Sequence, residues 1–133
     1  MKTTELYRIA EKDGITVERF GLILNKSVSV CFNDGLFVGI DGQMAGADEK
    51  VCLAHELGHC ETMSFYNVYS PLDIRGKHER RADIWAIKKL IPKSRYLWAL
   101  KHGYRDIYSL AEYFEVTPEF ARKAADYYGA LTA

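Results

Sequence analysis

The chain has 133 residues, of which 48% are hydrophobic, so it has the size of one typical domain and can bury a core. Its 18 basic and 18 acidic side chains balance, which excludes a strong overall attraction to nucleic acid or to an anionic membrane. The first residues lack the apolar stretch of a signal peptide, and the three irregularly spaced cysteines do not form a secreted disulfide framework. We therefore expect a soluble cytoplasmic protein with reduced thiols.

The first twenty residues predict a short helix followed by a strand. Leu6, Ile9 and Ala10 have the spacing of the buried side of a helix, which Asp13-Gly14 ends. Residues 15–20 then alternate between apolar and polar side chains, as a strand with one buried face does.

Two further strands are predicted around a tight turn. Residues 27–33 and 36–40 are rich in β-branched and aromatic side chains. They flank Asp34-Gly35, a favoured two-residue hairpin turn. The fold class predicted for the whole chain is therefore α+β, with a small antiparallel sheet of about three strands packed on helices.

The segment 51–59 carries the strongest functional signal. His55 and His59 are four residues apart, so on a helix they share a face and can hold one metal ion between them. Imidazole nitrogens suit Zn²⁺, and a catalytic zinc site keeps one position for water. Glu56 lies between the two histidines and is predicted to be the base beside that water.

Short His-Glu-x-x-His patterns also arise by chance on surface helices, so other residues must support this interpretation. Gly58 does so, because glycine inside a helix costs roughly 1 kcal/mol relative to alanine and usually marks a close approach. Cys60 is a further candidate ligand. With Leu53 and Leu57, however, it forms an apolar stripe that we expect to be buried on the side away from the histidines.

The helix predicted from Glu79 to Leu90 supplies carboxylates. Glu79 would complete a His, His, Glu ligand set, and the apolar residues that follow it share its face against the first metal helix. Asp83 lies one turn further along and is placed to accept a hydrogen bond from a zinc-bound histidine. Before this helix, the apolar residues of 64–77 have neither helical nor strand spacing, so we expect this segment to be a loop beside the site. Tyr69 or Tyr66 in that loop is a candidate oxyanion stabiliser, although both tyrosines could simply pack.

The end of the chain reads as helices. A short helix after Pro92 is closed by Gly103, and two more are predicted at 107–114 and 118–128, the last capped by Thr117. Two helices joined by three residues have the length pattern of a helix-turn-helix. Residues 104–129 hold three basic and five acidic side chains, a net charge of −2, so direct DNA binding is disfavoured.

With these motifs in place, the chain resembles the ImmA/IrrE family of zinc metallopeptidases, which are common in prophages and mobile elements. The likeness runs from the first helix through Leu-Ala-His-Glu-Leu-Gly-His at 53–59 to the helix that opens Glu-Arg-Arg-Ala-Asp at 79–83. It implies a minimal thermolysin-like domain, for which we expect residues 1–103, and a helix-turn-helix-like tail at 104–133. His55, His59 and Glu79 would be the ligands of one zinc ion, and Glu56 the general base.

The resemblance also implies a substrate, since characterised members cleave a helix-turn-helix repressor. The function predicted is therefore a zinc endopeptidase acting on such a repressor, with no membrane partner. An exposed strand, Val28 to Phe32 or Leu36 to Ile40, would bind the extended substrate. Two alternatives remain: a non-cleaving module that sequesters a repressor, which has no need of Glu56, and a DNA-binding protein with a structural zinc.

Overall fold

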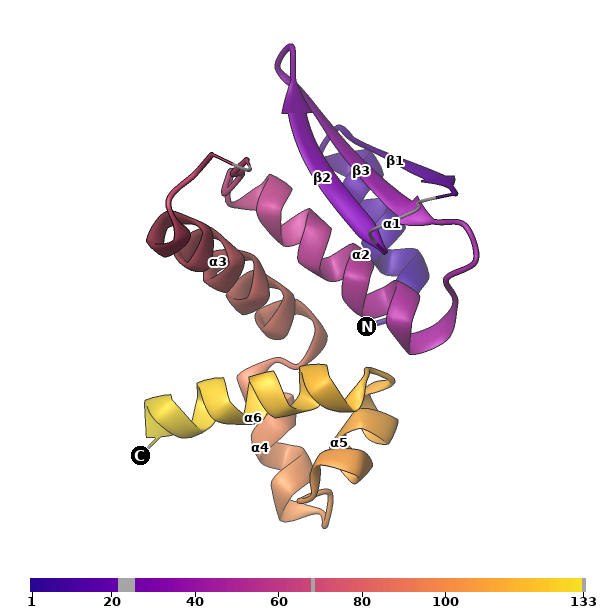
Figure 1. Cartoon of the computed structure of the whole chain (residues 1–133). Helices are drawn as coiled ribbons and strands as arrows, with labels where there is room; N and C mark the ends of the chain where they lie inside the picture. The colour runs from indigo at the N-terminus through magenta and orange to yellow at the C-terminus, as the bar shows by residue number, and fades with distance from the viewer. Residues whose placement is uncertain (22–25, 68, 133) are drawn as a thin grey trace.

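The computed structural model describes residues 1–21, 26–67 and 69–132. The elements in chain order are α1 (Thr3–Lys12), β1 (Ile15–Phe20), β2 (Ser27–Phe32), β3 (Gly35–Asp41), α2 (Gly46–Glu61), α3 (Leu72–Leu90), α4 (Lys93–Lys101), α5 (Ile107–Phe114) and α6 (Pro118–Thr132). The α+β class is confirmed. Figure 1 shows α2 between the sheet and α3, with α4, α5 and α6 gathered beyond the end of α3. Among the described residues, no helix has the length and hydrophobicity that crossing a bilayer requires.

The sheet has three strands in the order β1-β3-β2, and it is mixed. β2 and β3 pair antiparallel, as predicted, but β1 pairs parallel to β3, so the prediction of a wholly antiparallel sheet is wrong. The chain does reverse direction after each strand. However, β3 is the most buried strand, with Val38 and Ile40 in the core, and it takes the central place between the other two. After two reversals β3 runs in the same direction as β1, so the two strands pair parallel when β3 lies beside β1.

The hairpin turn lies one residue earlier than predicted. Phe32 pairs with Gly35, so the two turn residues are Asn33 and Asp34, both with positive φ. Two successive positive φ values match a type I′ turn, whose twist suits a hairpin, and Asn and Asp tolerate this conformation better than other non-glycine residues. Gly35 instead begins β3, where a Cβ atom would lie 2.8 Å from the ring of Phe37.

Helix α3 begins at Leu72, about two turns before the predicted start at Glu79. Residues 72–77 are thus helical, where the sequence predicted a loop. The first two turns project mostly into solvent, and Leu72 is 81% exposed. Their sequence therefore lacks the regular spacing of buried apolar residues by which a helix is predicted. Pro71 is extended and precedes the first helical residue, a position that proline tolerates well.

The core joins α2 to every layer of the molecule. Leu53, Leu57 and Cys60 form the buried stripe predicted for this helix, and they pack with α1, the sheet and the apolar face of α3. The same cluster includes Leu110, Phe120 and Tyr128 of the terminal helices. The two histidines lie on another side of α2, where they meet α3 nearer its start, at Glu79.

At Gly58 the backbones of α2 and α3 approach each other closely. A Cβ atom there would lie 2.6 Å from the backbone oxygen of Ala82, a distance that real Cβ atoms essentially never show. Ala82 is fully buried, so the backbone of α3 has little room to retreat. The glycine therefore lets the two helices that carry the candidate metal ligands lie side by side.

We expect Gly58→Ala to lower the free energy of unfolding. Overpacking costs typically about 1–3 kcal/mol, whereas alanine gains only about 1 kcal/mol over glycine in a helix. Chemical denaturation of the metal-free protein measures the change. Gly76→Ala in α3 is the matched control, since nothing lies within 4 Å of its added methyl group, and it should raise stability. Equal stability of Gly58→Ala and the parent would contradict the close packing.

Candidate metal centre

Three side chains from two helices converge at the face where α2 meets α3. The Nε2 atoms of His55 and His59 are 3.2 Å apart. The Glu79 carboxylate lies 2.9 Å from the first and 3.0 Å from the second. These ligand atoms all lie within 4.8 Å of one another. A tetrahedral zinc ion with bonds of about 2.0–2.1 Å needs ligand atoms about 3.3 Å apart, so the set has the right size.

The outer nitrogens of both histidines are held by hydrogen bonds that fix the ring orientation. His55 Nδ1 donates to Asp83 Oδ1 at 2.9 Å, and His59 Nδ1 donates to the backbone oxygen of Ser64 at 2.6 Å. In a neutral imidazole this leaves the inward Nε2 unprotonated, as a metal ligand must be. Lone pairs of two nitrogens and a carboxylate then face one another, which is favourable only with a cation or a proton among them.

The electrostatics of the metal-free site agree with this description. Burial lowers the pKa of His55, but hydrogen bonds to Asp83 and Glu79 outweigh burial and raise that pKa to about 10. Hydrogen bonds from His55 and His59 hold the pKa of Glu79 well below its usual range, although burial opposes them. A proton on His55 thus takes the place of a cation, and metal binding would have to release it.

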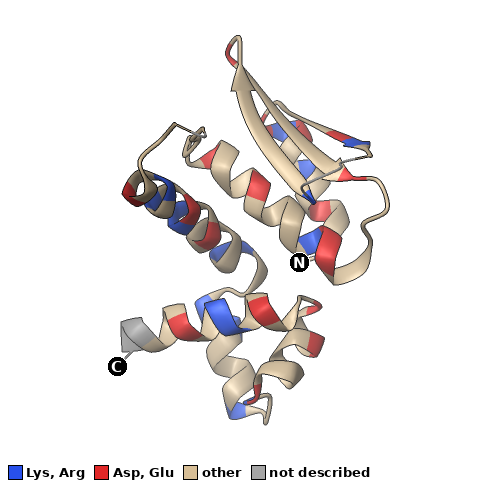
Figure 2. Cartoon of the chain, viewed as in Figure 1, with Lys and Arg blue, Asp and Glu red and all other residues tan. Residues whose placement is uncertain are grey.

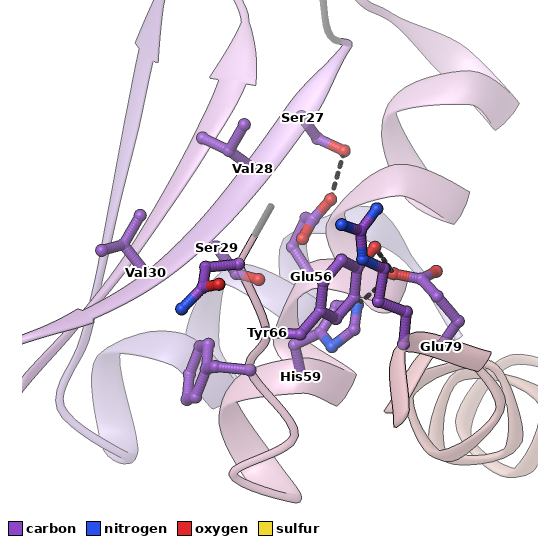
Figure 3. A pocket seen from close by; sticks show the side chains of 11 residues that line it. Ser27, Val28, Ser29, Val30, Glu56, His59, Tyr66 and Glu79 are labelled. Carbon is purple, nitrogen blue, oxygen red and sulfur yellow. Dashed lines mark hydrogen bonds and ion pairs between the residues drawn. The ribbon is translucent and has the colours of Figure 1, made fainter. Parts of the chain in front are cut away.

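Glu56 lies at the same cleft and is held by a residue that the sequence did not suggest. The residue is 93% buried, and its carboxylate accepts a hydrogen bond of 2.6 Å from the hydroxyl of Ser27, the first residue of β2. Figure 3 shows this bond beside His59 and Glu79. Because Ser27 and Glu56 are 29 residues apart and on different elements, only the packing of β2 on α2 brings them together.

The loop before α3 brings one of the two candidate tyrosines to the site. Tyr66 Oη donates to Glu79 Oε1 at 2.6 Å, and this bond, followed by burial, raises the pKa of Tyr66 to about 12 (Figure 3). Tyr69 is 91% exposed and does not line the cleft. His78 of α3 donates to the backbone oxygen of Phe65, which ties the loop to the helix that carries Glu79. The structure thus places Tyr66, and not Tyr69, beside the ligands.

The cleft has a volume of about 440 Å³ and opens along the sheet. One wall is formed by the β2 residues 27–30, and the opposite wall by the loop residues 65–67 and by Arg75 and Glu79 of α3. Glu56 and His59 form its floor. Neither Ser27 nor Arg75 has a recognisable pattern in the sequence. Their place here is visible only when the strand and the helix are assembled.

The C-terminal helix reaches the back of the centre. Lys123 Nζ of α6 lies 3.3 Å from Asp83 Oδ2, while the other oxygen of Asp83 holds His55. Burial raises the pKa of Asp83, but His55 and Lys123 outweigh it, so that the pKa is lowered. Cys60 is buried in the core, where burial raises the pKa of its thiol to about 12, and it is not among the converging ligands.

Comparison with known proteins adds one finding to this geometry. A family model described as Peptidase M78, the IrrE N-terminal-like domain, matches residues 10–126, which is most of the chain. No curated protein matches the sequence.

Proposed function

Because the chain belongs to the Peptidase M78 family, whose model is the IrrE N-terminal-like domain, we propose that it is a zinc-dependent endopeptidase. The family supports a metallopeptidase-like function. The observation that carries the proposal is that His55, His59 and Glu79 converge, and that two of them, His59 and Glu79, line a cleft together with Glu56. A base beside three metal ligands is the arrangement that metal-assisted hydrolysis requires.

The donor set favours zinc over other cations. Two imidazole nitrogens and one carboxylate oxygen match the His, His, Glu ligands of known catalytic zinc sites. Magnesium and calcium prefer oxygen ligands alone. Cys60 packs in the core and is not among the converging atoms, so three protein ligands leave a fourth position for water.

The chemistry divides between the ion and the protein. When bound, zinc polarises the substrate carbonyl and lowers the pKa of a water molecule to about 7. Glu56 takes the proton from the attacking water and returns it to the nitrogen of the leaving amine. The Ser27 hydroxyl holds the Glu56 carboxylate in place for both transfers. Asp83 and the Ser64 carbonyl keep the two imidazoles oriented toward the ion.

Among the described residues of the cleft, Tyr66 is a group that can stabilise the developing oxyanion. It lies at the cleft with its hydroxyl 2.6 Å from Glu79, and its raised pKa keeps that hydroxyl protonated. A turn of the side chain from Glu79 toward the substrate carbonyl would let the hydroxyl donate there.

The β2 edge is proposed to bind the extended substrate. Of the two predicted strands, Leu36 to Ile40 lies in the central strand and is wrong as an edge, whereas Val28 to Phe32 lies in the edge strand β2. Proteins normally protect exposed edges with charged side chains. β2 has none, as Figure 2 shows, although the other edge strand, β1, carries Glu18 and Arg19. An unprotected edge along the cleft suits strand addition by a peptide.

The pairing register of β2 with β3 identifies which backbone groups of β2 are free to bind a substrate strand. The turn closes the Phe32–Gly35 pair with hydrogen bonds, and bonded pairs alternate along an antiparallel ladder. The N–H and C=O groups of Ser29 and Cys31 therefore point away from β3. Ser29 lies in the cleft wall, beside the metal ligands.

A helix-turn-helix transcriptional repressor of a prophage or mobile element is the proposed substrate, on the resemblance to ImmA/IrrE proteins. The test is incubation of the zinc-loaded protein with the helix-turn-helix regulator encoded nearest to its gene, followed by mass spectrometry. We expect two fragments that sum to the intact regulator plus one water, and none after chelation. A stable complex without fragments would instead indicate a sequestering module.

The edge strand can be tested in the same assay. Ser29→Pro removes the outward N–H without breaking a bond to β3, so cleavage should fall while zinc binding stays at the parent level. Ser29→Ala is the control, because it removes the hydroxyl and keeps the N–H. Cleavage by Ser29→Pro at the parent rate would remove the edge from the binding site.

A further inference from the structure

We propose that the groove between α4 and α5 is a docking site for an acidic segment of a protein partner that carries a large apolar side chain. This surface shares no residue with the metal cleft. From Glu79 to the end of α3 there are eleven residues, or about 16 Å of helix. A partner held at the groove therefore leaves the cleft open.

Basic side chains without acidic ones are concentrated on α4 and the turn that follows it. Residues 93–105 contain four of them, Lys93, Arg95, Lys101 and Arg105, and no aspartate or glutamate, in a chain whose overall charge is zero. All four are exposed. The local electrostatic field at this surface thus attracts a negatively charged partner, although the net charge of the whole protein is zero.

Two adjoining hollows make the surface concave. The first, about 340 Å³, lies between α4 and α5, and its wall includes Arg95, Trp98 and Tyr113. The second, about 370 Å³, shares Arg95 and Tyr113 with the first and continues toward Lys50 and Lys89. The charged side chains of the two hollows are four basic and two acidic ones: Lys2, Lys50, Lys89, Arg95, Glu5 and Glu115. Lys2 and Glu115 pair with each other, so a net positive charge remains.

Trp98 is the exposed aromatic side chain of the groove, and its neighbours hold it in place. Trp98 is 43% exposed, and its ring stacks on His102 at 3.9 Å and on Tyr113 at 5.7 Å between centroids. Arg95 donates to the Tyr113 hydroxyl at 2.9 Å, which holds the guanidinium against the stack. Trp, Tyr and Arg dominate the energetics of protein interfaces, and side chains that are ordered beforehand lose little entropy on binding.

The charge pattern selects a short protein segment over a nucleic acid. One wall of the groove is formed by α5 and Glu115, which belong to the segment 104–129 with its net charge of −2. A nucleic acid needs a continuous basic track for its phosphates, and the acidic helices interrupt one here. A short acidic peptide can instead pair with Arg95 and Lys89 and place one apolar side chain against Trp98.

The test selects ligands without assuming their sequence. A random twelve-residue phage library is depleted on the Arg95→Glu variant and then selected on the zinc-loaded Glu56→Gln protein, which cannot cut the bound peptides. We expect peptides enriched in Asp and Glu around an aromatic residue or leucine. A synthetic consensus peptide should bind the full-length protein about tenfold or more weakly when Arg95→Glu or Trp98→Ala is introduced.

Arg122→Glu on α6 is the matched control, since it makes the same change at another exposed site. It should leave binding unchanged, and circular dichroism should show that all variants are folded. The proposal is overturned if no peptide survives the depletion, if the survivors lack acidic residues, or if Arg122→Glu weakens binding as much as Arg95→Glu. It is also overturned if a dT15 oligonucleotide binds and loses its affinity in Arg95→Glu, because that result would assign the groove to nucleic acid.

Discussion

Glu56→Gln should retain the metal and lose about 10²–10⁴-fold in turnover. Glutamine has nearly the same shape as glutamate but cannot accept the proton of the attacking water. Its amide can still accept a hydrogen bond from the Ser27 hydroxyl, which lies 2.6 Å from Glu56, so the cleft should keep its shape. Zinc content measured by inductively coupled plasma mass spectrometry, together with the rate of fragment formation, separates binding from chemistry.

Glu61→Gln is the matched control for this substitution. Glu61 ends the same helix and does not line the cleft, so turnover should remain at the parent level. A Glu56→Gln variant that cuts as fast as the parent would remove Glu56 as the general base. A variant that loses its zinc would instead show that the carboxylate has a structural part in the site.

His59→Ala should abolish both zinc binding and cleavage. His59 is 96% buried, and its Nε2 faces His55 and Glu79, so its removal takes away one of the three ligand atoms that converge among the described residues. Competition with a chromophoric chelator measures the affinity. Loss of a ligand should exceed the roughly 10–100-fold weakening expected of Asp83→Ala, which only releases the outer nitrogen of His55.

His102→Ala is the control, because His102 is exposed on the surface beyond α4 and lies outside the centre. It should bind zinc as the parent does. Tight zinc binding by His59→Ala would mean that the ion is held elsewhere, and the hydrolytic mechanism would then lose its basis. Because histidines must be unprotonated to bind, zinc affinity should also fall as the pH is lowered.

Local patterns were sufficient for much of this protein. The bounds of α5 and the start of α6 were predicted closely, whereas α6 continues to Thr132, four residues past the predicted end. Thr117 was visible as the cap of α6, and it accepts a hydrogen bond from the Phe120 N–H. The pair at His55 and His59 was visible because helical spacing alone puts both on one face. Gly58 was likewise visible as an anomaly, and the structure explains it by the Ala82 backbone.

Local sequence patterns were insufficient wherever a structural feature depends on contact between two segments that are distant in the sequence. The parallel pairing of β1 follows from which strand is most buried, and the early start of α3 is hidden because its first turns face solvent. Ser27 and Lys123 reach Glu56 and Asp83 across 29 and 40 residues, and neither has a local signal.

The sequence by itself determined the donor types, their helical spacing and the carboxylate between them, because these depend only on residue identity and a periodicity of 3.6. Tertiary structure alone decided that Glu79 meets the two histidines, that Tyr66 rather than Tyr69 reaches the ligands, and that β2 forms the edge beside them. The physical reason is that such contacts depend on how closely two elements pack. Here that distance is determined by a buried core and by a glycine at the crossing of two helices.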